Sequence, residues 1–271
     1  MTIWQSGDIT VNGLRLHYTR TGGDKPPVVL AHGFSDDGLC WTPVAELIAA
    51  KYDVVMVDAR GHGKSDGPKR GYGSAEHAGD VAGVITGLGL KRPAVLGHSM
   101  GAATALALAG TYPDLPRAIL LEDPPAFWIA PPSGKPGRRP SHFTDWIVEL
   151  KRKTREEMIA NQRAQSPTWS EAELGPWADS KLRLSFNVLS RGKSAPVDWP
   201  ATVQRITCPT LLITADPEKG AIVSLEAAAA LQALAPQTRV VHIAGAGHSI
   251  RREQFARYMD VVESFLAETN V

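Results

Sequence analysis

The stretch VLGHSMGAATALALAG, residues 95–110, places a serine between two glycines where the character of the chain changes. Apolar residues precede Ser99, as in a buried strand, and an alanine-rich run typical of a helix follows it. Gly97 and Gly101 carry no side chain where a strand and a helix would crowd a sharp turn. The pattern predicts that the Ser99 hydroxyl projects from a strained turn as a nucleophile; the plainer alternative is a serine that caps the helix.

Short apolar runs alternate with helical segments along most of the chain. These runs are typical of strands buried on both faces, and they lie within residues 26–33, 52–63, 92–99, 116–125, 208–216 and 238–248. The alternation predicts an α/β protein with a mostly parallel, doubly wound sheet. Asn12-Gly13, between two β-prone runs, predicts an N-terminal hairpin.

Residues 124–200 interrupt this alternation. Residues 124–140 contain six prolines, which exclude a central strand or a long helix there. The rest of the segment has helical spacing and holds, with residues 124–140, five of the seven tryptophans. We expect a core domain of residues 1–123 and 201–271 and a helical cap insertion at 124–200.

Composition excludes several classes of partner. The 29 basic and 28 acidic residues leave a formal charge of +1, which gives no reason to expect nucleic acid or an anionic membrane as partner. Cys40 and Cys208 form no disulfide framework, and no spacing of histidines and carboxylates suggests a metal site. The first residues lack the pattern of a signal peptide. We expect a cytoplasmic protein that acts on a small molecule without metal or cofactor.

A nucleophilic serine needs a base and a site for the oxyanion. His248 follows the last expected strand, in a glycine-containing turn that can carry an imidazole across the sheet edge. His32 and His62 are better explained as residues that tie down their loops, and His98 would point away from a sharp turn. The backbone N–H groups of Phe34 and Met100 are the expected oxyanion hole.

These motifs together resemble the α/β-hydrolase family. The resemblance runs through HGF (32–34), DARGHGKS (58–65), GHSMG (97–101) and GAGH (245–248), and it covers the chain apart from the insertion. It implies the fold, a cap at the position of the insertion, and catalysis by a serine, an acid and a histidine. It argues against dehalogenases and epoxide hydrolases, which carry an aspartate at the nucleophile position.

The resemblance also implies where the acid should lie. In most of the family the acid follows the strand after the cap, where Asp216 stands, and Asp216 is therefore the expected acid. Glu218, two residues further, is an alternative in the same loop. Some relatives place the acid after the strand before the cap, where Asp123 stands, although an aspartate before a proline is also a common turn residue.

The expected function is hydrolysis of small to medium carboxylic esters, or of a lactone, through an acyl-enzyme on Ser99. A C–C bond hydrolase or a perhydrolase uses the same three residues and stays open as an alternative. The alternative from another class is a weakly catalytic small-molecule-binding protein on the same scaffold. Oligomeric state and physiological substrate stay open.

Aromatic residues of the insertion are expected to roof the pocket in part: Phe127, Trp128, Phe143, Trp146, Trp169, Trp177, Phe186 and Trp199.

Overall fold

The computed structural model describes residues 4–129, 141–190 and 194–269. Its strands are β1 (Gln5–Val11), β2 (Leu14–Arg20), β3 (Pro27–Ala31), β4 (Asp53–Val57), β5 (Ala94–His98), β6 (Ala118–Glu122), β7 (Thr210–Thr214) and β8 (Thr238–His242). Its α-helices are α1 (Thr42–Ile48), α2 (Ser74–Gly87), α3 (Met100–Thr111), α4 (Ser141–Leu150), α5 (Arg155–Gln165), α6 (Glu171–Arg183), α7 (Trp199–Gln204), α8 (Leu225–Leu234), α9 (Ile250–Glu253) and α10 (Phe255–Glu268). Short 3-10 helices cover Gly38–Trp41, Phe186–Leu189 and Pro217–Lys219.

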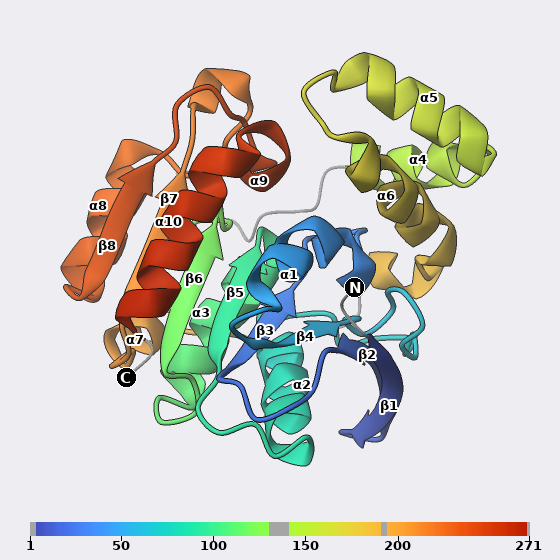
Figure 1. Ribbon diagram of the computed structural model, residues 1–271. Helices are drawn as coiled ribbons and strands as arrows, with labels where there is room; N and C mark the ends of the chain where they lie inside the picture. Colours follow the sequence, from blue (N-terminus) through green and yellow to red (C-terminus); the bar gives the residue numbers. More distant parts are fainter. Residues whose placement is uncertain (1–3, 130–140, 191–193, 270–271) are drawn as a thin grey trace.

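The strands form a single eight-stranded sheet in the order β1-β2-β4-β3-β5-β6-β7-β8 (Figure 1). Strands β4, β3, β5, β6, β7 and β8 are parallel to one another, while β1 and β2 pair antiparallel with each other and β2 pairs antiparallel with β4. The predicted mostly parallel, doubly wound sheet is therefore confirmed. Because β5, β6 and β7 are consecutive neighbours, the loops that follow them meet at one edge of the sheet.

The predicted hairpin at Asn12-Gly13 joins β1 and β2. Asn12 has φ 51° and Gly13 has φ 75°, the two positive values that a two-residue turn between twisted strands requires. The Asn12 side-chain amide donates to Asp80 at 3.1 Å and so ties the hairpin to α2.

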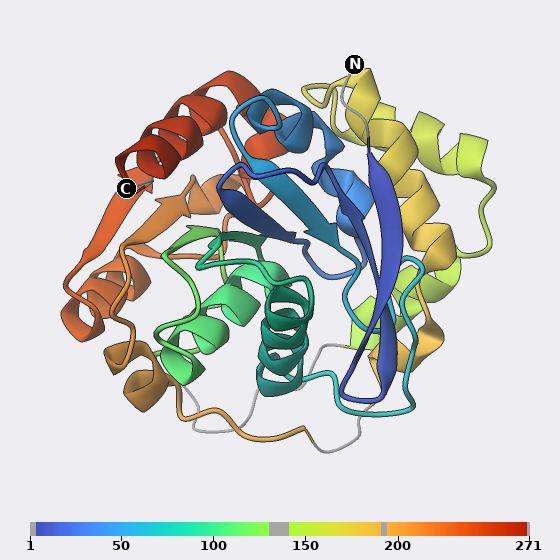
Figure 2. The same ribbon diagram turned by 60° about the horizontal axis from the view of Figure 1, so that its bottom comes forward.

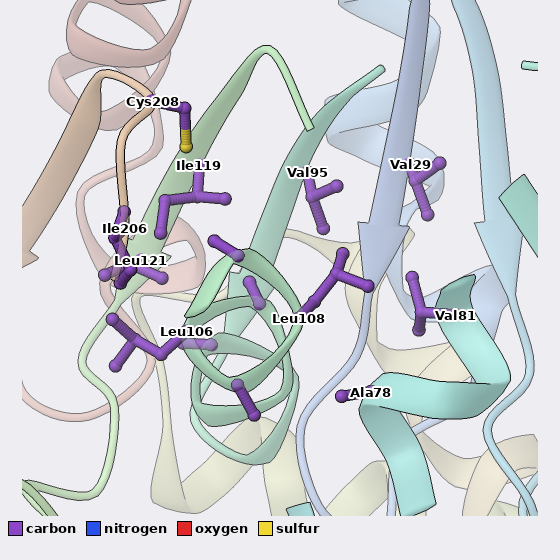
Figure 3. Packing of buried hydrophobic residues seen from close by; sticks show 14 of the residues in the cluster. Val29, Ala78, Val81, Val95, Leu106, Leu108, Ile119, Leu121, Ile206 and Cys208 are labelled. Atoms are coloured by element: carbon purple, nitrogen blue, oxygen red, sulfur yellow. The ribbon is translucent and has the colours of Figure 1, made fainter. Parts of the chain in front are cut away.

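Helices cover both faces of the sheet (Figures 1 and 2). One apolar cluster packs α2, α3 and α8 against one face, and a second packs α1 and α10 against the other. The alanines of α3 let this helix lie close to the sheet, with Leu106 and Leu108 beneath β5 and β6 (Figure 3). Burial on both faces explains why the central strands are apolar throughout rather than alternating.

Helices α4, α5 and α6 lie between β6 and α7 in the chain and gather at one side of the molecule (Figure 1, upper right). They share a small apolar cluster of their own, formed by Leu150, Met158, Trp177 and Ala178. We call α4–α6 the cap helices. No helix within the described ranges is long and apolar enough to cross a membrane.

Candidate active site

Ser99 lies in the turn between β5 and α3, as its sequence context predicts. Its φ of 51° and ψ of −113° are unusual for a residue other than glycine, and such strain is typical of functional turns. A Cβ on Gly97 would collide with the backbone of Gly101, and a Cβ on Gly101 with the Ala31 carbonyl. Only glycine at both positions allows this approach, which leaves the half-buried Ser99 side chain at the edge of the sheet.

His248 lies in the loop between β8 and α9 and contacts Asp123. Its Nδ1 is 2.6 Å from Asp123 Oδ2. Because a carboxylate accepts hydrogen bonds, Nδ1 carries the proton and donates it, and Nε2 of the neutral ring is left as an acceptor. This is the tautomer that a base for a serine hydroxyl needs.

Asp123 directly follows β6 and is held rigidly. Its side chain is fully buried, and its carboxylate accepts hydrogen bonds from the backbone N–H groups of Ile222 (2.9 and 3.1 Å) and Val223 (3.0 Å). Asp123 also has φ 43°, a left-handed conformation that aspartate tolerates better than most residues. The surrounding loops therefore fix the carboxylate in the position that orients His248.

The expectation that Asp216 orients His248 is wrong in this structure. Asp216 accepts hydrogen bonds from His242 Nε2 at 2.9 Å and from the Gly245 N–H at 2.7 Å. Glu218 lies exposed in the same loop. The sheet order alone favours Asp216, because β7 is the direct neighbour of β8, the strand that His248 follows. The loop contacts decide otherwise: Asp216 is held by His242 and Gly245 in the turn before His248, and the His248 ring contacts Asp123 instead.

Ser99 and His248 line one cavity of about 710 Å³, together with Phe34 and Met100, the two residues of the expected oxyanion hole. Met100 is the first residue of α3, where N–H groups point out of the helix. The structure thus brings the sequence-predicted residues to one place, with Asp123 in the position expected for Asp216.

The aromatic residues of the insertion divide into two groups. Phe127, Trp146, Trp169 and Trp177 line the cavity, as expected for a roof. Trp128 is buried and its indole N–H donates to the Ala227 carbonyl at 2.8 Å, so it anchors the chain to α8. The structure does not place Phe186 or Trp199 on the cavity wall, and the Phe143 side chain lies outside the described residues.

The expectation that His98 points away from the turn is wrong in this structure, because His98 lines the cavity together with Ser99 and His248. Its Nε2 lies 2.9 Å from the backbone carbonyl of His248, and the two rings are 4.8 Å apart between centroids. A carbonyl only accepts, so Nε2 carries the proton. Burial, with smaller contributions from the charges of Arg251 and His248, holds the pKa of His98 well below its usual range. A neutral His98 therefore supports the backbone of the His248 loop.

His32 and His62 tie down their loops, as predicted. His32 Nδ1 lies 2.8 Å from the Gly33 carbonyl, and its Nε2 accepts from the Ala59 N–H at 3.0 Å. His62 Nδ1 lies 2.9 Å from the Arg60 carbonyl. Among the residues that the structure describes, no group of His, Cys, Asp and Glu side chains could hold a metal ion.

Comparison with known proteins places this site in a family. The family described as alpha/beta hydrolase fold matches residues 26–251. N-formylmaleamate deformylase of Pseudomonas putida is 29% identical over 98% of this chain and 97% of its own length. 2-(Acetamidomethylene)succinate hydrolase of Mesorhizobium japonicum is 33% identical over 43% of this chain and 40% of its own length.

Solved structures agree with the sequence comparison. The crystal structure of an N-formylmaleamic acid deformylase from Pseudomonas putida superimposes with a TM-score of 0.80 at 26% identity, covering 95% of this chain and all (100%) of the other. The matched residues 26–251 include both the strand–serine–helix turn at Ser99 and the loop of His248. The chain is therefore a hydrolase that belongs to the alpha/beta-hydrolase fold family.

Proposed function

We propose that the protein hydrolyses small carboxylic esters through an acyl-enzyme intermediate on Ser99. The observation that carries the proposal is the 2.6 Å contact between His248 Nδ1 and Asp123, because His248 lines the same cavity as Ser99. This contact fixes the tautomer of His248 in which Nε2 is an acceptor.

In the first step, Ser99 Oγ attacks the acyl carbon while His248 Nε2 takes the hydroxyl proton. Asp123 stabilises the imidazolium that forms, because its carboxylate is already positioned at Nδ1. His248 then gives the proton to the leaving alcohol. In the second step, His248 activates a water molecule that releases the acid and regenerates Ser99.

The developing negative charge on the acyl oxygen requires donors. The backbone N–H groups of Phe34 and Met100 are our candidates, since both residues line the cavity beside Ser99. The amino-terminal end of α3 adds a favourable dipole at the same place.

A second candidate function is removal of an acyl group from an amide nitrogen. The Pseudomonas putida relative, which spans almost the whole chain, is named a deformylase of N-formylmaleamate. The same serine, histidine and aspartate would serve both reactions, because both pass through a tetrahedral intermediate and an acyl-enzyme.

The test is turnover of p-nitrophenyl esters of increasing chain length, with lactones, simple amides and N-formylmaleamate alongside. Ser99→Ala should lower ester turnover by roughly 10⁴–10⁶. Ser264→Ala, on the exposed part of α10, is the matched control and should keep wild-type turnover. A fluorophosphonate should label Ser99 in the wild type. The proposal fails if Ser99→Ala keeps more than about a tenth of the wild-type rate, that is, if the substitution raises the activation barrier by less than about 1.4 kcal/mol.

A further inference from the structure

Buried charged residues connect cap helix α6 with the loop after β3 and with α9. From α6, Lys181 contacts Asp36, which lies in the loop after β3, at 2.6 Å. Also from α6, Glu173 contacts Arg252 of α9 at 2.9 Å, and Arg252 contacts Asp36 at 3.0 Å. Of these residues, Asp36, Lys181 and Arg252 line the cavity that holds Ser99.

Lys181 has no hydrogen-bonding capacity left for a ligand. Its ammonium group has three N–H donors, and it has three acceptors: Asp36 Oδ1 at 2.6 Å, the Ser35 carbonyl at 3.1 Å and Ser180 Oγ at 3.3 Å. Lys181 therefore joins the cap to the core and offers little to a molecule in the cavity.

Asp36 is also fully engaged. Oδ1 accepts from Lys181, and Oδ2 accepts from Arg252 at 3.0 Å and from Arg251 at 3.4 Å. Burial raises the pKa of Asp36, but the charges of Arg252, Lys181 and Arg251 outweigh burial and hold this pKa well below its usual range. Asp36 is therefore an anion that accepts from its own cations and has no proton to give to a ligand.

Arg252 differs from both, because one of its nitrogens is uncommitted. Its Nε donates to Glu173 at 2.9 Å and its Nη2 to Asp36 at 3.0 Å. No described residue accepts from Nη1, and Arg252 lines the cavity although only 3% of its side chain is exposed. The guanidinium carbon Cζ lies 4.5 Å from the Trp169 ring centroid. Two nitrogens and the ring thus hold the group in one orientation, and the third nitrogen is left without an acceptor among the described residues.

We infer that Arg252 Nη1 binds a carboxylate of the substrate, so that this hydrolase prefers anionic acyl compounds over neutral ones of the same shape. The inference rests on the proposed function, because it names the substrate class of the same cavity. Phe127, Trp146, Trp169 and Trp177 supply apolar surface to the same wall. A suitable substrate therefore places its scissile acyl group at Ser99 and a carboxylate at Arg252.

A guanidinium suits this task for a physical reason. Charge-assisted hydrogen bonds between arginine and carboxylate are about twice as strong as neutral ones, and a pre-oriented guanidinium loses little entropy on binding. A neutral ester group at the same place would accept a hydrogen bond without the charge. The alternative explanation is that Arg252 only fastens α6 to α9, in which case the charge of the substrate makes no difference.

The test compares 4-acetoxybenzoate with its neutral methyl ester, methyl 4-acetoxybenzoate. The kcat/KM of each is divided by its rate constant for hydrolysis by hydroxide, which removes the difference in leaving group. The wild type should prefer the anion by at least about tenfold. Arg252→Lys should reduce that preference to below about threefold, because lysine lacks a third nitrogen fixed toward the cavity. The readout is the ratio of the two normalised values of kcat/KM, so a general loss of activity in the variant does not alter it.

Two further variants separate binding from folding. Arg252→Met combined with Glu173→Gln removes both charges of one buried pair, leaves Asp36 with Lys181 and Arg251, and should lose the preference in the same way. Arg183→Gln breaks the neighbouring ion pair between Arg183 of α6 and Asp37, whose closest atoms are 2.6 Å apart. Neither of these two residues lines the cavity. This control should keep the wild-type preference. Thermal melting verifies that each variant folds.

Calorimetry with the Ser99→Ala protein distinguishes failure of this inference from failure of the proposed function. If the wild type hydrolyses neither ester, the proposed function fails. The affinities of the two compounds for the Ser99→Ala protein still show whether Arg252 binds a carboxylate. Binding of 4-acetoxybenzoate that is at least about tenfold tighter than that of the methyl ester, and that weakens with Arg252→Lys, supports the site. Equal affinities, no binding of the anion, or a preference that survives Arg252→Lys would overturn it.

Discussion

Two histidine–aspartate pairs lie at the same edge of the sheet, and they differ in which ring nitrogen contacts the carboxylate and in the partner of the other nitrogen. His248 lines the cavity together with Ser99. Its Nδ1 donates to Asp123, whose side chain is fully buried. His242 uses Nε2 to contact Asp216, and its Nδ1 lies 3.2 Å from Thr214 Oγ1. Both ring nitrogens of His242 therefore have partners, and its side chain is 45% exposed.

The difference shows that a histidine beside a carboxylate is not by itself a base for a serine. In the first pair, the carboxylate takes one nitrogen and leaves the other facing the cavity. In the second pair, Asp216 also accepts from the Gly245 N–H, and its own N–H donates to the Ala246 carbonyl at 2.9 Å. The second pair thus shapes the turn that carries His248, while the first pair supplies the chemistry that we propose.

The largest expected effect distinguishes the two histidines. His248→Gln should lower ester turnover by roughly 10⁴–10⁶, because no other group then takes the proton of Ser99. His242→Gln should keep turnover within about tenfold, since His242 does not line the cavity. Steady-state kinetics with p-nitrophenyl butyrate measures both, with melting temperatures as a check of folding. Similar losses in the two variants would erase the distinction between the pairs.

The next effect distinguishes the two aspartates. Asp123→Asn should lower kcat by about 10²–10⁴, because an amide at this position does not hold the tautomer of His248 that leaves Nε2 free. Asp216→Asn should cost less than about tenfold, since its carboxylate contacts the turn rather than His248. The same ester assay applies to both variants. A severe loss in Asp216→Asn, with Asp123→Asn close to wild type, would restore the assignment that the sequence favoured.

The smallest effect concerns His98, which contacts the backbone of His248. Burial keeps the pKa of His98 well below its usual range, so the folded protein holds this ring neutral while the unfolded chain protonates it near pH 6.5. Unfolding below about pH 6.5 therefore takes up a proton at His98. The contribution of His98 to the free energy of unfolding is complete above that pH and is lost as the pH falls below it. His98→Gln should reduce the loss of unfolding free energy between pH 7.5 and 5.5 by up to about 1 kcal/mol.

Urea unfolding at the two pH values measures this effect. His62→Gln is the matched variant, because burial also lowers the pKa of His62 while that ring lies away from the His248 loop. Both variants should flatten the pH dependence, but only His98→Gln should also change ester turnover. An unchanged pH dependence in His98→Gln would show that this ring does not control stability in the range tested.

Local patterns in the sequence were sufficient for the framework of the molecule. The apolar runs and the helices between them predicted the parallel sheet, and Asn12-Gly13 predicted the hairpin. Ser99 could be singled out because the two glycines that allow its turn are adjacent in sequence. His248 could be proposed because its loop follows a strand that ends at the same sheet edge. In each case residues close in sequence carry the necessary information.

Tertiary structure decided what depends on residues far apart in sequence. Asp123 and His248 are 125 residues apart and follow β6 and β8, which are not neighbours in the sheet, so their contact depends on how the loops after these strands fold. The backbone donors that fix Asp123 come from residues 222 and 223, about a hundred positions away. The orientation of the Arg252 guanidinium likewise depends on Glu173 of α6 and Asp36 of the loop after β3, which lie 79 and 216 positions away. Such contacts leave no local pattern, because they form only when packing of the sheet and cap brings distant loops together.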